Sequence, residues 1–175
     1  MAFNTKVKIN NIDVTSPALF FLGDVFKKYD FSKVEYILLS RHKQLHGICY
    51  YPSRKFQRKK FKIQCHVPET YPYITFIREK PIYITDSTQK PQVPEGCTID
   101  GSGINVQTSK SWYIVSSRFT VQDVNEALVF IVGHEIFHYL RRTRQIPGVN
   151  LQSQADVFGK NLVKEYKEYL NTKGK

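Results

Sequence analysis

The strongest constraint on the fold of this chain is a helical run of apolar residues in its C-terminal half. The run extends from residue 121 to about residue 142. Residues 127–132 are all apolar, so this helix has no polar face that could be exposed to solvent. Such a helix must be covered on every side, which places it at the centre of the molecule. Gly133 follows directly and lowers helix stability by about 1 kcal/mol relative to Ala. We therefore expect a strand or a substrate to approach the helix closely at this glycine.

Three ionisable residues interrupt the buried run in a His-Glu-x-x-His pattern, at His134, Glu135 and His138. Histidines four residues apart share one helix face and can bind the same metal ion. Glu135 lies about 100° around the helix, from where it can reach a metal-bound water. Burying these groups without partners is costly, and a metal ion that fixes them removes the difficulty. The pattern is typical of zinc peptidases, in which the histidines bind Zn²⁺ and the glutamate is the general base.

A catalytic zinc ion needs three protein ligands and one open position. A final helix, expected from about residue 153 to residue 170, can supply the third ligand if it folds back on the first helix. Asp156 in its first turn is the leading candidate, although Ser153 and Asp156 also have the spacing of a capping box. Glu165 and the neutral Gln152 are the alternatives. We therefore expect Zn²⁺ to be held by the two motif histidines and Asp156.

The remaining pattern predicts an α+β fold in which an N-terminal helix and a small mixed or antiparallel sheet pack on the motif helix. The N-terminal helix should begin at Ser16-Pro17, after an edge strand or arm within residues 1–16. Strands are expected at residues 34–39, 47–51, 61–67, 73–78, 81–85, 104–107 and 112–116. Residues 47–51 and 61–67 should pair as a hairpin. Residues 88–103 are rich in Pro, Gly, Asp and Ser and are predicted to form a loop.

Composition indicates a single folded domain over residues 1–175, with 41% apolar and 14% aromatic residues. No apolar run is long enough to span a membrane, and the first residues lack the apolar stretch of a signal peptide. Cys49, Cys65 and Cys97 are odd in number and widely spaced, which argues against a disulfide framework or a zinc ribbon. These features favour a cytoplasmic protein.

A second pair of histidines, His42 and His46, has the same spacing as the motif pair. Lys43 follows the first of them, so this pair lacks a general base and cannot repeat the catalytic pattern. We expect these two residues to be surface or inter-strand histidines.

The motif helix resembles that of the zincins, the HEXXH zinc metallopeptidases. The matching segments are residues 132–140, which read Val-Gly-His-Glu-Ile-Phe-His-Tyr-Leu, and residues 154–158, which read Gln-Ala-Asp-Val-Phe. In size and order the chain is similar to small intracellular zincins, the SprT-like proteases and the ImmA/IrrE-type peptidases. The resemblance implies a zincin-like fold, a Zn²⁺ cofactor and a substrate laid along an edge strand, here residues 104–107 or 112–116. It also implies an oxyanion-stabilising group, for which Tyr113, Tyr139 and Arg144 are candidates.

The chain departs from the pattern of each zincin subfamily. Metzincins have Gly and His where this chain has Arg141 and Arg144, and their methionine turn has no counterpart because Met1 is the only methionine. ImmA/IrrE-type proteins usually have Glu where this chain has Gln152 or Gln154. SprT-like proteins commonly use a third histidine, and no histidine follows the motif here. The resemblance therefore supports the superfamily and no particular subfamily.

The charge balance suggests a different class of partner. The chain has 26 basic and 15 acidic residues, a net charge of +11, which favours nucleic acids, acidic proteins or anionic surfaces. The predicted hairpin loop between Arg54 and Lys62 interleaves Phe56 and Phe61 with cations, as nucleic-acid-binding sites do. The alternative function is thus a nucleic-acid-associated protein with a structural or degenerate metal site, or a protease that acts on DNA-bound proteins.

Overall fold

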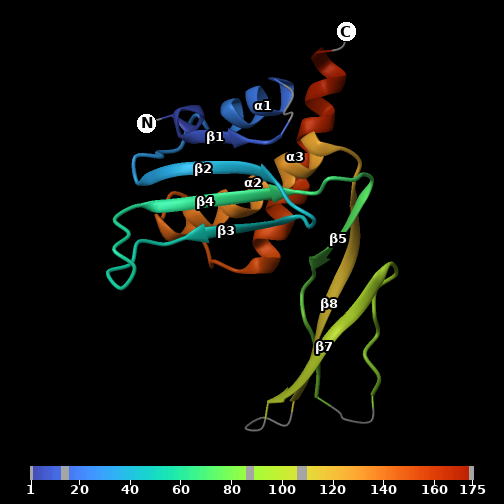
Figure 1. Ribbon diagram of the computed structural model, residues 1–175. Helices are drawn as coiled ribbons and strands as arrows, with labels where there is room; N and C mark the ends of the chain where they lie inside the picture. Colours follow the sequence, from blue (N-terminus) through green and yellow to red (C-terminus); the bar gives the residue numbers. More distant parts are fainter. Residues whose placement is uncertain (1, 13–15, 86–88, 106–109, 174–175) are drawn as a thin grey trace. The chain divides into compact units, whose positions relative to one another are not determined.

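The computed structural model describes residues 2–12, 16–85, 89–105 and 110–173, which form three α-helices and two β-sheets (Figure 1). The predicted α+β character is confirmed at this level. The chain divides into two compact units, of which the first combines Met1–Tyr73 with Val121–Lys175 and the second is Ile74–Thr120. None of the described helices is both long and apolar enough to cross a membrane.

The first unit contains a four-stranded sheet in the order β1-β2-β4-β3. Three of its strands are parallel, namely β1 (Val7–Asn10), β2 (Val34–Arg41) and β4 (Phe61–Val67). The fourth, β3 (His46–Tyr50), pairs antiparallel with β4 and forms one edge of the sheet, as the hairpin prediction requires. β1 forms the other edge, which confirms the predicted N-terminal edge strand. Burial alternates strictly along β4, so only one face of this sheet belongs to the core.

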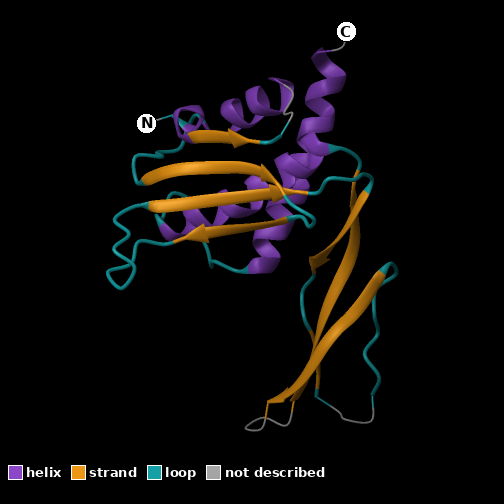
Figure 2. Cartoon of the chain, viewed as in Figure 1, coloured by secondary structure: helices purple, strands orange, loops and turns teal. Residues whose placement is uncertain are grey.

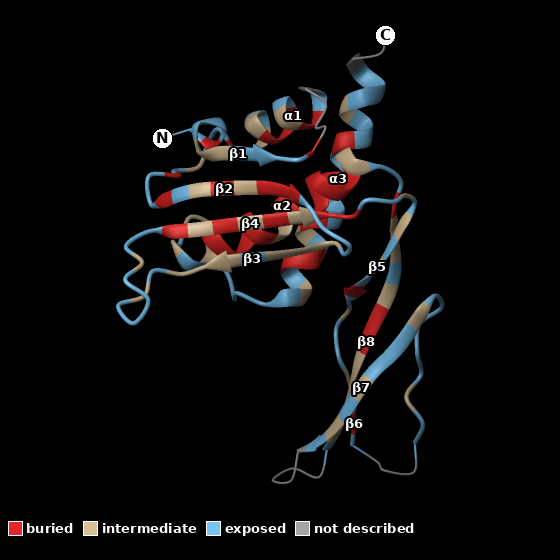
Figure 3. Cartoon of the chain, viewed as in Figure 1, coloured by how far each residue is buried: buried red, intermediate tan, exposed pale blue. Residues whose placement is uncertain are grey.

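Helices cover that face. α2 (Val124–Arg142) packs against β3 and β4, while α1 (Ser16–Phe26) and α3 (Gln152–Lys173) both contact α2 (Figure 2). A short 3₁₀-helix, η1 (Phe3–Lys6), precedes β1 and packs near α1. Residues on all sides of α2 are buried, which confirms that it is the central helix (Figure 3).

The start of α2 differs from the prediction by three residues. Asp123 is the N-cap, and its carboxylate accepts hydrogen bonds from the backbone N–H groups of Asn125 and Glu126 at 2.8 and 2.9 Å. Residues up to Val121 continue the preceding strand instead. The apolar character of Val121 reflects burial at the end of a strand and not the first turn of the helix.

Gly133 is explained by a neighbouring helix, and the expectation of a strand or substrate at this position was wrong. The Cα of Gly159 on α3 lies 3.3 Å from the place where a Cβ of residue 133 would be. A Cβ on Gly159 would in turn lie 2.6 Å from the carbonyl oxygen of Phe130. The two glycines therefore let α2 and α3 cross at close range, which brings the first turn of α3 beside the motif.

Replacing Gly159 with Ala should destabilise the protein by about 1–3 kcal/mol, because the new methyl group meets a backbone oxygen that cannot move aside. This loss should outweigh the higher helix propensity of Ala. Thermal unfolding measures the effect, and Asn161→Ala at an exposed position of the same helix is the control. An unchanged or higher melting temperature for Gly159→Ala would contradict the close crossing.

The second unit is built around β8 (Lys110–Val121), which pairs with β5 (Tyr73–Arg78), β6 (Ile82–Ile84) and β7 (Cys97–Asn105). The predicted strands at 73–78, 81–85 and 112–116 correspond to β5, β6 and part of β8. The predicted loop at 88–103 was wrong from Cys97 onward, because these residues form most of β7. Gly103 suits this strand, since any side chain there would run into the ring of Trp112. Residues 106 and 107 of the predicted strand 104–107 lie outside the described residues.

Candidate metal centre

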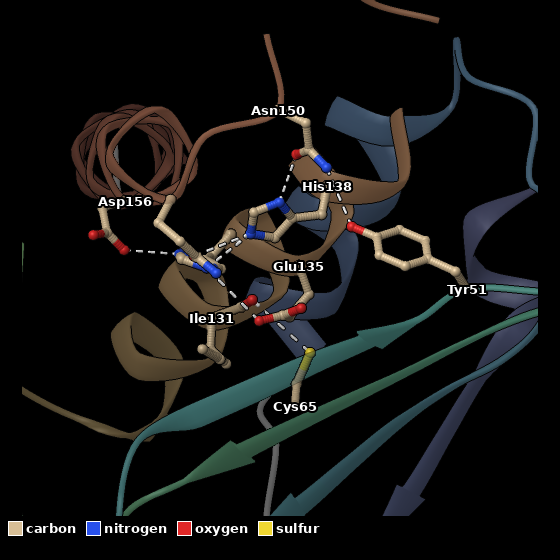
Figure 4. A network of polar contacts seen from close by, with 9 residues as sticks. Tyr51, Cys65, Ile131, Glu135, His138, Asn150 and Asp156 are labelled. Carbon is tan, nitrogen blue, oxygen red and sulfur yellow. Dashed lines mark hydrogen bonds and ion pairs between the residues drawn. The ribbon is translucent and has the colours of Figure 1, made fainter. Parts of the chain in front are cut away.

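The two motif histidines present the same ring atom to one point beside α2. His134 Nε2 and His138 Nε2 lie 3.2 Å apart, as expected for side chains one helical turn apart on one face. Both residues are largely buried, with His138 only 7% exposed. Figure 4 shows His138 between α3, which carries Asp156, and the chain that carries Tyr51.

The other nitrogen of each imidazole is held by an oxygen acceptor. His138 Nδ1 donates to Asn150 Oδ1 at 2.6 Å, and His134 Nδ1 lies 2.8 Å from Asp156 Oδ1. Asn150 Nδ2 donates in turn to the Tyr51 hydroxyl at 3.2 Å, which fixes the orientation of the amide. With both Nδ1 atoms protonated, both Nε2 lone pairs face the shared point.

A third possible donor atom, an amide oxygen at the start of α3, lies near the two imidazole nitrogens. Gln152 Oε1 lies 3.2 Å from His138 Nε2, so an amide carbonyl oxygen lies beside the imidazole nitrogens. Ligands placed about 2.0–2.1 Å from a tetrahedral Zn²⁺ are separated by about 3.3 Å from one another. The 3.2 Å separations therefore match the edges of a zinc coordination shell, and the donor set fits this metal.

Asp156, the predicted third ligand, lies beside the motif in the first turn of α3. Its carboxylate contacts Nδ1 of His134, the ring atom that faces away from the shared point. Consistent with this, no group of three or more His, Cys, Asp or Glu side chains within the described ranges is arranged to hold a metal ion. Glu165 is exposed on α3 and lies about 20 Å beyond Gln152 along the helix axis, too far to share the site.

Glu135 points from α2 toward β3, beside the histidines. Its side chain is 5% exposed, and Oε1 lies 3.8 Å from His134 Nε2. Burial raises the pKa of Glu135 to about 7, although the charge of His134 and the backbone N–H of Cys49, which donates to the carboxylate, oppose this shift. A carboxylate with a pKa near neutrality can both accept and release a proton at physiological pH.

Gly47 makes room for this carboxylate. A Cβ at residue 47 would lie 2.5 Å from Cγ and 2.6 Å from Oε1 of Glu135. The glycine in the middle of β3 therefore lets the strand pass directly over the Glu135 side chain. The sequence analysis did not predict three residues of the site, namely Gly47, Asn150 and Tyr51. A glycine inside a predicted strand was the one signal that could have indicated a close approach at Gly47.

The two histidines differ in their affinity for a proton. Burial lowers the pKa of His138, and the nearby His134 lowers it further, despite the hydrogen bond to Asn150. Burial also disfavours the charged form of His134, but the contact with Asp156 and the charge of Glu135 outweigh it, so the pKa of His134 is raised. In the metal-free chain, one proton on His134 can therefore occupy the space between the two Nε2 atoms.

Replacing Glu135 with Gln should stabilise the metal-free protein at alkaline pH. The folded-state pKa of about 7 exceeds the ordinary value of 4.5, so folding favours the protonated acid. The stabilisation is therefore full below about pH 4.5 and is lost as the pH rises through 7, by about 3 kcal/mol in total. We expect Glu135→Gln to melt about 5–10 °C higher than the wild type at pH 8 with chelator, and equally at pH 4.5.

The exposed Glu165→Gln variant is the control for this experiment and should show no such pH-dependent difference. Equal melting temperatures of wild type and Glu135→Gln at pH 8 would show that the carboxylate is not buried as the structure places it.

An open cavity of about 220 Å³ lies over the site. Its lining combines motif residues with β3 and the chain that follows it: Gly47, Ile48, Cys49, Tyr51, Glu135, His138 and Gln152. β3 is thus the edge strand beside the motif, and the segments 104–107 and 112–116 assigned to this role belong to the second unit.

Of the three residues predicted to stabilise an oxyanion, none lines this cavity. Tyr139 is fully buried and its hydroxyl donates to the carbonyl oxygen of Asp30 at 2.6 Å. Arg144 lines a separate cavity of about 460 Å³, together with Lys33 and Arg142. Tyr113 is part of β8 in the second unit. Tyr51 is the tyrosine that lines the cavity over Glu135 and His138.

The second histidine pair does not lie on a helix, because His42 directly follows β2 and His46 begins β3. His46 in β3 pairs with His66 in β4, and their rings stack at 4.5 Å, while the exposed His42 ring lies 4.6 Å from that of His46. The expectation of surface or inter-strand histidines is confirmed.

Comparisons with protein-family models, with curated proteins and with solved structures found no match to this chain. The function of the chain is therefore inferred from the geometry of the candidate metal centre.

Proposed function

We propose that the chain is a zinc-dependent endopeptidase of the zincin type. The observation that supports this most directly is that Nε2 of His138 lies 3.2 Å from both Nε2 of His134 and the amide oxygen of Gln152, so that three possible metal donors lie together. Glu135 lies beside this point at the floor of an open cavity, where a general base is needed.

In this proposal the zinc ion is held by His134, His138 and Gln152. Asp156 and Asn150 orient the two imidazoles through Nδ1, as carboxylates and amides commonly do behind zinc-binding histidines. This assignment changes the predicted role of Asp156 from ligand to orienting residue. The bound ion would supply a Lewis acid that polarises the substrate carbonyl and activates water.

The residues of the chain would then move the protons. Glu135 accepts a proton from the attacking water, because its carboxylate is buried beside the donor atoms and its pKa lies near 7. The same carboxyl group delivers that proton to the amine that leaves, so that one residue acts first as base and then as acid. Gly47 gives the Glu135 side chain the room that it occupies beside β3.

β3 provides a place for the substrate backbone. It is the terminal strand of its sheet, and the cavity over Glu135 is lined by three of its residues, Gly47, Ile48 and Cys49. An extended peptide can therefore add to the free edge of β3 by backbone hydrogen bonds, which holds the scissile bond over α2. Because such bonds are made by the backbone, they set the position of the substrate and not its sequence.

Tyr51 is placed to stabilise the oxyanion that forms during hydrolysis. It follows β3 directly and lines the same cavity as Glu135 and His138. Its hydroxyl oxygen accepts the hydrogen bond from Asn150 Nδ2, which leaves the phenolic proton free to be donated to a substrate oxygen. A donor that acts on developing charge lowers the barrier more than it strengthens substrate binding.

Tyr51→Phe should lower kcat for peptide hydrolysis by about 10–100-fold and leave KM nearly unchanged. Steady-state kinetics on one peptide substrate separate the two constants, and the zinc content should remain that of the wild type. Tyr50→Phe, at a neighbouring position outside the cavity lining, is the matched control. A rise in KM with unchanged kcat would assign Tyr51 to substrate binding instead.

The proposal is tested by incubating the zinc-loaded protein with a complex mixture of peptides and identifying cleaved bonds by mass spectrometry. We expect cleavage that stops on chelation and returns when stoichiometric zinc is added. Cleavage that survives chelation, or no cleavage by protein that holds one zinc ion per chain, would overturn the proposal.

A further inference from the structure

The face of the first sheet that turns away from α2 carries a pattern that the proposed hydrolysis does not use. Along β4, Phe61, Ile63 and Cys65 face the helices and are buried, so the alternate residues face outward. The strand register places the outward residues of neighbouring strands side by side. They are Tyr36 and Leu38 on β2, Lys62, Gln64 and His66 on β4, Tyr50, Ile48 and His46 on β3, and Lys8 on β1.

Aromatic rings alternate with cations across this outer face. Tyr36 and Tyr50 flank Lys62 on the two strands next to β4. The Tyr36 ring has the Lys62 ammonium 5.4 Å from its centre and the Lys8 ammonium 5.2 Å away. Arg58 holds the corresponding position over Tyr50, at 5.0 Å.

The connection between β3 and β4 extends the same pattern beyond the sheet. Arg58 also lies 5.1 Å from the ring of Phe56, which is 62% exposed, and Lys55 lies 5.5 Å from that ring. Residues 51–62 contain six basic and no acidic residues. The nearest counter-charge on the sheet is Glu35, whose Oε1 lies 3.4 Å from Lys62 Nζ. The local charge is therefore strongly positive around three accessible or half-buried rings.

We propose that a single-stranded nucleic acid binds across this outer face, with bases stacked on Tyr36, Tyr50 and Phe56 and phosphates paired with the surrounding lysines and arginines. Rings on a sheet surface with cations between them are suited to unpaired bases, because every base offers a stacking face and every nucleotide a phosphate. The lysines over Tyr36 have flexible side chains that can move from the ring to a phosphate when a base stacks there.

The spacing of the rings favours a single strand over a duplex. Tyr36 and Tyr50 are separated by one intervening strand, which places them about 10 Å apart. Bases within a duplex are stacked about 3.4 Å apart and cannot open onto two such rings, whereas a flexible strand can splay its bases. An acidic protein would satisfy the cations but would leave the rings without stacking partners.

Fluorescence anisotropy with a labelled 20-nucleotide oligo-dT measures the binding, at several salt concentrations. Phe56→Ala should weaken binding about ten-fold, and the Tyr36→Ala, Tyr50→Ala double variant should weaken it further, with no change in salt dependence. Lys8→Ala with Lys62→Ala should instead lower the slope of log affinity against log salt by about 1.4, since each phosphate that a lysine no longer neutralises reduces the slope by about 0.7. Phe56 is exposed, so its replacement does not endanger the fold.

Lys160→Ala with Lys164→Ala, at two exposed positions of α3, is the matched control for charge and should leave both affinity and slope unchanged. Equal affinity for the 20-base-pair duplex or for polyglutamate would overturn the proposal, and so would wild-type affinity in the Phe56→Ala and double-tyrosine variants. No detectable oligo-dT binding at 50 mM salt would overturn it as well. The assay needs no peptidase activity, so its outcome is independent of the proposed hydrolysis.

Discussion

Replacing Glu135 with Gln should lower kcat/KM for peptide hydrolysis by about 10²–10⁴-fold while one zinc ion per chain stays bound. The amide has the size of the carboxylate and can keep the hydrogen bond from the Cys49 backbone, but it cannot accept a proton from water. Zinc should remain because Glu135 is not among the three donor atoms that meet at the histidines. Peptide kinetics and metal analysis of the same preparation measure both quantities.

Glu165→Gln is the control for this comparison, because it removes one carboxylate from α3 at an exposed position. It should leave activity and zinc content unchanged. Undiminished hydrolysis by Glu135→Gln would contradict the role of Glu135 as base. Loss of zinc together with activity would show that Glu135 is itself a ligand.

Removing a donor atom from the proposed shell should have the second large effect. We expect His138→Ala to abolish zinc binding, because its Nε2 is the donor common to both 3.2 Å contacts. Removing a residue that only orients a ligand weakens metal binding by about 10–100-fold. Gln152→Ala should weaken zinc binding by at least this factor. Competition with a chromogenic chelator measures the affinities. Binding of zinc at 1,000 times its dissociation constant stabilises the fold by about 4 kcal/mol, so melting temperatures give a second readout.

Asp156 and Gln152 can be separated by exchanging amide and carboxylate groups. Asp156→Asn keeps an oxygen that can accept from His134 Nδ1 and should weaken zinc binding about ten-fold or less, whereas Asp156→Ala should approach 100-fold. Gln152→Glu should tighten zinc binding, because a charged oxygen replaces a neutral one. If Asp156→Asn lost zinc as completely as His138→Ala, Asp156 would be a ligand and the predicted role from the sequence would stand.

The central helix and its neighbour were predictable because their signals are local. The apolar run of α2 and the stripe of α3 repeat at helical spacing, and the motif residues sit where this spacing places them. β4 and β5 were found with their observed bounds, since strict alternation or a compact apolar run marks each of them. Element type therefore followed from residue pattern wherever the pattern extended over several residues.

The positions of Asp156 and Gln152 relative to the two histidines could not be predicted from residue spacing. The sequence analysis predicted that the first turn of α3 lies beside the motif, and Asp156 does contact His134. Which of the two ring nitrogens a neighbour contacts depends on the angle and depth of the helix crossing, which the Gly133–Gly159 contact sets. Helical spacing shows which residues share a face but carries no information on that crossing.

β7 and the position of β3 at the edge of its sheet were not predicted, for a related reason. Glycines in β7 gave the composition of a loop, although Gly103 is needed because Trp112 lies over it. The role of β3 depends on sheet order, and β3 is an edge only because β4 inserts between it and β2. Strand order is a long-range property, and the residues of β3 alone do not reveal it.

A crystal structure of zinc-loaded Glu135→Gln protein, with the metal located by its anomalous signal, would show directly which residues bind the zinc ion. We expect one zinc ion about 2.0–2.2 Å from His134 Nε2, His138 Nε2 and Gln152 Oε1, with Asp156 on His134 Nδ1. A zinc ion coordinated by Asp156 in place of Gln152, or one bound away from both motif histidines, would contradict it.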